Sequence, residues 1–157
     1  MELGEFKERR ELRNSEIRAL VDEAQAKCNE FFKEQYRYDD TEAVEELGID
    51  SELVQQLVEE YVKQIVKSTT LFKKYLETLK EQNSKKDLLD FTPFRELVHK
   101  NLGVARNLRI KDSEQILKEL MTYESLDEIE VYLSILEACA IKLKPLSAYK
   151  ALQEQES

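Results

Sequence analysis

Apolar residues recur at intervals of three and four positions along almost the whole chain, which is the spacing of one face of an α-helix. The longest such run extends from Leu53 to Leu79. The 157 residues include only 3 glycines and 2 prolines that could interrupt helices, and no segment has the alternating pattern of a strand. The sequence therefore predicts an all-α protein, in which 41% hydrophobic residues suffice to form a buried core.

Signals for helix starts and ends divide the chain into segments with short connections. Asn14 or Ser15 can begin the first helix, and Gly48 ends a short one. Asp50 or Ser51 can cap the long helix that follows, and Ser125 with Glu128 has the pattern of a capping box. The predicted helices cover about residues 15–35, 41–47, 51–82, 92–110, 113–121, 126–143 and 146–153. Helices of these lengths with short connections favour an antiparallel bundle.

The first 40 residues are predicted to form a separate N-terminal helical extension, and residues 41–157 the bundle domain. The extension carries a stripe of large apolar side chains, so we expect it to pack on the bundle or on a second copy of the chain as a dimer contact. The stripe comprises Ile17, Leu20, Val21, Ala24, Cys28, Phe31 and Phe32.

His99 is the only histidine of the chain, and it lies within a predicted amphipathic helix. At about 100° per residue, Arg95, Gly103 and Arg106 fall on the same side of this helix as His99. We expect this side to be exposed. The opposite side, which should be buried, comprises Phe94, Leu97, Asn101, Val104, Ala105 and Leu108.

Charge is unevenly distributed along the chain, whose formal net charge is −9. This excess of acids argues against a general nucleic-acid-binding protein, because affinity for phosphate backbones comes from excess Lys and Arg. Residues 95–111 are the exception, with five cations and a single acid, Glu96. Such a basic stretch suits an acidic partner or a phosphoryl group, although it could also be a solvated helix face.

The two cysteines, Cys28 and Cys139, each lie on an apolar helical face, which predicts small buried side chains in a reducing cytoplasm. There is no zinc-ligand spacing and no second histidine, so no metal site is expected. No apolar run approaches 18 residues and no signal peptide is recognisable. We therefore expect a cytoplasmic protein without a membrane segment.

Four sequence features accompany His99. Gly103 follows His99 at the fourth position and Leu108 at the ninth; the helix is entered through the segment 90–94, and Leu47-Gly48-Ile49-Asp50 lies upstream. These residues, with a long helix before and two helices after, resemble the histidine-containing phosphotransfer (HPt) domains of bacterial phosphorelays. The resemblance covers about residues 47–143 and implies the HPt four-helix bundle.

The resemblance implies that His99 accepts a phosphoryl group from an aspartyl phosphate and passes it on. Gly103 would leave room for the partner, and the surrounding contacts would come from Arg95, Lys100, Leu102 and Arg106. The implied partner is the receiver domain of a response regulator or of a hybrid histidine kinase. The chain itself would need no cofactor, since Mg²⁺ would be bound by the receiver.

This sequence departs from the family pattern at three positions. Asn101 and Leu102 stand where the family has Leu and Lys, and Arg109 stands where it often has Gly. A non-catalytic HPt-like adaptor, which docks a receiver or kinase without carrying phosphate, is therefore an alternative to the phosphocarrier. A helical domain of a larger protein is a third hypothesis. Triads, P-loops and paired carboxylates are not recognisable, so a phosphocarrier or adaptor is favoured over a true enzyme.

Overall fold

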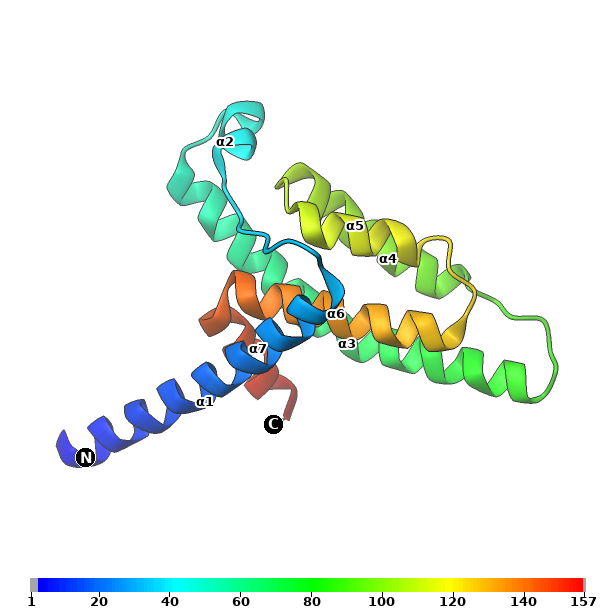
Figure 1. Ribbon diagram of the computed structural model, residues 1–157, viewed down its shortest axis with the longest axis horizontal. Coiled ribbons are helices and arrows are strands. Elements are labelled where there is room, and N and C mark those ends of the chain that lie inside the picture. Colours follow the sequence, from blue (N-terminus) through cyan, green and yellow to red (C-terminus); the bar gives the residue numbers. More distant parts are fainter. Residues whose placement is uncertain (1–2, 157) are drawn as a thin grey trace.

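The computed structural model describes residues 3–156, which form helices joined by short connections, with no strand among them (Figure 1). The prediction of an all-α protein is confirmed. The helices are α1 (Leu3–Phe31), α2 (Thr41–Leu47), α3 (Ser51–Ser84), α4 (Thr92–Asn107), α5 (Lys111–Leu120), α6 (Leu126–Leu143) and α7 (Pro145–Glu156).

A bundle of four helices forms the centre of the molecule. Helix α3 packs on α4 and α6, and α5 packs on the same two helices from the other side. Successive helices of this bundle run in alternating directions (Figure 1). Large side chains fill the space between them, among them Tyr61, Phe72, Phe94, Ile116, Leu117 and Leu136. The predicted antiparallel helical bundle is therefore the observed architecture.

Helix α1 packs with its C-terminal half on α6 and α7, and its N-terminal half projects from the bundle (Figure 1). Ala24 and Cys28 belong to the same hydrophobic core as the bundle residues. The helix starts at Leu3, well before the predicted start near Asn14. Glu, Lys, Arg and Leu dominate the intervening stretch, and these residues have high helix propensity even without an apolar face.

The caps of α2 and α3 agree with the sequence prediction. Gly48 ends α2 with a φ of 66°, a left-handed conformation that glycine adopts without steric cost. Asp50 caps α3, since its carboxylate accepts a hydrogen bond of 2.8 Å from the backbone N–H of Leu53. No helix within residues 3–156 is both long enough and apolar enough to cross a lipid bilayer.

The Asp50 cap gives a test of helix stability. Asp50→Ala should lower the free energy of unfolding by about 1 kcal/mol, because the N–H of Leu53 loses its acceptor. Urea denaturation followed by far-UV circular dichroism measures the change. Asp50→Ser is the matched control, since its hydroxyl can accept the same bond; equal losses in both variants would contradict a capping role.

Candidate functional site

His99 is exposed near the middle of α4, as the sequence predicts. Lys100, Gly103 and Arg106 are exposed as well, and Arg95 is half-buried. The opposite side of α4 faces the core through Phe94, Val98, Asn101, Leu102 and Ala105. The structure therefore brings an imidazole and several cations to one accessible helix surface.

Two predicted positions on α4 are wrong. Leu102 is only 4% exposed, so it cannot form an apolar contact with a partner, whereas Val104 is 38% exposed and not buried. Helix α4 packs on both α3 and α5, and its buried surface includes Leu102. The helical repeat of the sequence does not reveal which sides of α4 its neighbouring helices cover. Phe94 and Leu108 are buried as predicted, and Leu97 is partly buried.

Gly103 lies one turn beyond His99 on the exposed surface of α4. A Cβ atom built at this position meets no other atom within 4 Å. The glycine is therefore not required for close contact between helices inside the molecule. What it provides is a flat stretch of helix beside the imidazole, on which a second molecule can approach the backbone closely.

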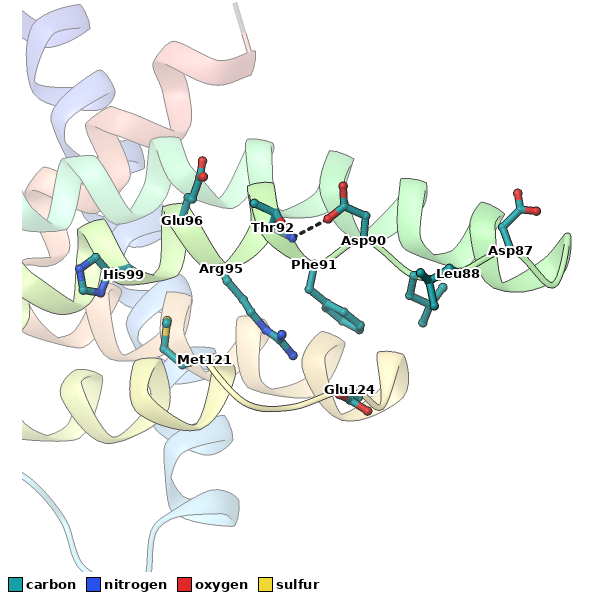
Figure 2. Close-up of a pocket in the computed structure, with 11 residues that line it drawn as sticks. Asp87, Leu88, Asp90, Phe91, Thr92, Arg95, Glu96, His99, Met121 and Glu124 are labelled. Carbon is teal, nitrogen blue, oxygen red and sulfur yellow. Dashed lines mark hydrogen bonds between the residues drawn. The ribbon is translucent and has the colours of Figure 1, made fainter.

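An open groove of about 930 Å³ begins at His99 and continues along the start of α4. His99 and Asp87 lie at opposite ends of it (Figure 2). The 85–91 connection, the first turns of α4 and the α5–α6 connection form its walls. The lining residues are Asp87, Leu88, Leu89, Asp90, Phe91, Thr92, Arg95, Glu96, His99, Met121 and Glu124.

Asp90 forms a turn immediately before α4. Its carboxylate accepts a hydrogen bond of 3.0 Å from the backbone N–H of Thr92, and this bond holds the pKa of the Asp90 carboxyl below its usual value. Helix α4 begins at Thr92, as its predicted range has it, and Pro93 occupies the first turn. Phe91 is at the N-cap position, and no side chain makes a capping hydrogen bond there.

Arg95 extends into the groove and away from His99 (Figure 2). Its guanidinium carbon lies 4.6 Å from the centre of the Phe91 ring, within the range of a cation–π contact. The Nε atom of Arg95 is buried and has no hydrogen-bond partner among the described residues. The positive charge is thus held beside the α5–α6 connection and not next to the imidazole.

Three of the five cations in the basic stretch 95–111 are paired with acids that lie outside the stretch. Arg109 pairs with Glu46, and Lys111 pairs with Glu42 at 3.1 Å, so α2 supplies both carboxylates. Arg106 pairs at 3.3 Å with Glu114, on α5. Within residues 3–156, Lys100 is the one cation of this stretch with neither an acidic nor an aromatic contact.

Two tyrosines of the 32–40 connection stabilise the corner between α4 and α5. Neither was predicted from the sequence to have this role. The Tyr38 hydroxyl donates a hydrogen bond of 2.7 Å to the carbonyl of Leu108, and the N–H of Lys111 donates one of 3.1 Å to Tyr36. Arg109 lies between these contacts with a φ of 60°. The corner is therefore fixed by residues 70 and 75 positions away in the sequence.

Asn101 is buried, as predicted, and its side chain is hydrogen-bonded. Its side-chain nitrogen donates to the hydroxyl of Ser68 on α3 at 3.1 Å and to the carbonyl of Leu97 at 3.0 Å. The side-chain oxygen is buried without a partner within the described chain. This polar contact fixes α4 against α3 directly beneath the exposed surface.

The candidate site is thus an exposed imidazole on a rigid helix, with open space at Gly103, unpaired charge at Lys100 and a groove that leads away past Arg95. Comparisons of this chain with protein-family models, with curated proteins and with solved structures found no match.

Proposed function

We propose that this chain is an HPt phosphocarrier that holds a phosphoryl group on His99 between two receiver domains. The observation that carries the proposal is the exposed imidazole in the middle of a bundle helix, with open space over Gly103 one turn further on. A histidine that only stabilised the fold would be expected to contact a core or surface partner. A cytoplasmic location goes with this proposal, because the implied donors are intracellular signalling domains.

Phosphoryl transfer requires few catalytic groups from the carrier itself. A neutral ring nitrogen of His99 attacks the phosphorus of an aspartyl phosphate, the bond from phosphorus to the carboxylate oxygen breaks, and the carboxylate leaves. The reverse step passes the group to the next aspartate. The receiver supplies Mg²⁺ and most of the charge stabilisation, so the carrier must supply an accessible nucleophile and room for docking.

Positive charge near His99 would come from Lys100 and Arg106. Glu114 pairs with Lys118 as well as with Arg106, so a phosphoryl group that takes the Arg106 guanidinium would leave the Glu114 carboxylate with its second partner. Arg95 lies further away and is better suited to contact the partner protein from the groove.

The backbone at Arg109 also supports the HPt proposal. Its positive φ is a conformation that glycine adopts most easily, and the family often has glycine at the corresponding place. The backbone conformation at Arg109 is therefore the one that a glycine at this position would favour, although the residue itself is an arginine. This agreement concerns the corner between α4 and α5.

A non-catalytic adaptor is the second candidate, and two observations favour it. The buried Leu102 occupies the place of the family's lysine, and Arg106 is already paired with Glu114. Such a chain would still present the surface around Gly103 to a receiver. It would dock a receiver or a kinase without accepting phosphate.

Phosphoryl transfer from receiver domains tests the proposal. A panel of receivers is phosphorylated with labelled acetyl phosphate and Mg²⁺, and each is incubated with the full chain. We expect an acid-labile, base-stable label that peptide mapping assigns to the segment containing His99. Acetyl phosphate without a receiver is the control and should leave the chain unlabelled.

Two other results would contradict the phosphocarrier. A chain that binds a phosphorylated receiver but takes no label would be the adaptor. A chain that neither binds nor labels with any receiver of the panel would argue against both candidates.

A further inference from the structure

A cavity of about 490 Å³ lies where the 32–40 connection meets α1, α3, α5 and α6. Its volume is within the range of about 300–1,000 Å³ that is typical of small-molecule sites. It shares no lining residue with the groove beside His99. Each element around it contributes polar side chains, among them Gln25 from α1, Gln55 from α3, Asp112 from α5 and Lys142 from α6.

Three cations line this cavity, and no acid is paired with any of them. Arg37 comes from the 32–40 connection, Lys142 from α6, and Lys144 from the residue that follows α6. Within residues 3–156, none of the three forms an ion pair. Three positive charges thus border one cavity in a chain whose formal net charge is −9.

Gln55 holds Lys144 at the cavity without neutralising it. The Nζ atom of Lys144 donates a hydrogen bond of 2.6 Å to the side-chain oxygen of Gln55. The nitrogen of the same amide donates one of 2.8 Å to the Asp40 carboxylate, and this second bond orients the amide. The Lys144 ammonium keeps two further N–H groups that a ligand can use.

Asp112 is the only acid among the described residues that line the cavity. One of its carboxylate oxygens accepts a hydrogen bond of 2.7 Å from the backbone N–H of Ser113 and one of 3.4 Å from the Ser113 hydroxyl. The carboxylate is therefore engaged at the start of its own helix. One acid also leaves an excess of positive charge against three cations.

We propose that this cavity binds a small oxyanion of at least two negative charges, a phosphate ester or a polycarboxylate, through Arg37, Lys142 and Lys144. Guanidinium and ammonium groups form charge-assisted hydrogen bonds with both kinds of ligand, and these bonds are stronger than neutral ones. The volume of the cavity suits a small organic molecule. The site lies apart from His99 and does not depend on phosphoryl transfer there.

A bound oxyanion would join the 32–40 connection to the end of α6, because Arg37 belongs to the first and Lys142 to the second. Tyr36 and Tyr38, on either side of Arg37, already hold the connection to the α4–α5 corner. The ligand should therefore protect the backbone amides of this connection from hydrogen exchange. It should also stabilise the folded chain in proportion to its concentration above the dissociation constant.

Isothermal titration calorimetry of the full chain with inorganic pyrophosphate and with citrate, at physiological ionic strength, tests the proposal. We expect one ligand to bind per chain. Tighter binding of pyrophosphate would indicate a phosphate ester as the ligand class, and tighter binding of citrate a polycarboxylate. Hydrogen exchange in the presence of the tighter ligand should show slower exchange in the 32–40 connection.

Substitutions of the lining residues give effects of opposite sign. Arg37→Gln and Lys142→Gln should each weaken binding by about 10-fold or more, since each removes a charge-assisted hydrogen bond. Asp112→Asn should tighten binding, because it removes a negative charge and keeps an oxygen that can accept from Ser113. Lys73→Gln is the matched control, since this exposed lysine of α3 does not line the cavity, and its affinity should equal that of the wild type.

The Arg37 variant keeps the test independent of folding. Arg37 is exposed, and its side chain makes no hydrogen bond or ion pair within residues 3–156. Absence of binding by both pyrophosphate and citrate would overturn the proposal. Equal losses in Arg37→Gln and Lys73→Gln would mean that overall charge attracts the anions. Unchanged exchange in the 32–40 connection on binding, or weaker binding by Asp112→Asn, would show that the anion occupies another place.

Discussion

His99→Gln is expected to abolish acid-labile phosphorylation of the chain while leaving receiver binding nearly unchanged. Glutamine has hydrogen-bonding groups at a similar distance from the backbone but no nitrogen that can accept a phosphoryl group. His99 is exposed, so the change leaves the packing of α4 intact. Labelling by a phosphorylated receiver and the dissociation constant of the same receiver measure the two effects separately.

Lys100→Gln is the matched control, since it removes a neighbouring exposed cation and keeps the imidazole. This variant should slow transfer but retain the label. A full label on His99→Gln would mean that another residue accepts the phosphoryl group. A large loss of binding in this variant would mean that the imidazole mainly makes a docking contact.

Gly103→Leu is expected to weaken receiver binding by about 100-fold, equivalent to roughly 3 kcal/mol, and to remove phosphoryl transfer with it. The new side chain would project from the flat surface beside His99, where the partner must approach. The fold should not suffer, because a Cβ here meets nothing within 4 Å and leucine has a higher helix propensity than glycine. Binding assays should therefore show weaker affinity for the receiver, while urea denaturation should show a higher free energy of unfolding.

Gly103→Ala separates the steric effect from the change in backbone propensity. Alanine should raise the free energy of unfolding by about 0.5–1 kcal/mol, as leucine does, but should leave most of the binding. Equal binding losses in the alanine and leucine variants would mean that helix flexibility matters and open space does not. Unchanged binding in the leucine variant would remove Gly103 from the candidate interface.

Local signals in the sequence were sufficient for the helices and for part of the candidate site. The Gly48 end of α2, the Asp50 start of α3 and the exposed position of His99 depend on neighbours within one or two helical turns. Asn101 was predictable for a related reason. An amide on the apolar side of a helix must find a partner, and Ser68 provides it.

Contacts between distant segments could not be predicted in this way. The burial of Leu102 depends on how α4 packs against its neighbouring helices. The helical repeat of the sequence does not reveal that packing. The charge of the basic stretch is similarly altered by Glu42 and Glu46, which lie more than 60 positions from the cations they neutralise. A linear count of charges therefore overestimates how basic this surface is.

The ion pairs between α2 and the α4–α5 corner have a consequence for ionic strength. Arg109 and Lys111 are already compensated within the molecule, so an acidic partner at this corner would exchange one ion pair for another and release few bound anions. Binding there should depend only weakly on salt concentration. Lys100 has no such internal counterion, and a partner that contacts it should lose affinity as salt is added.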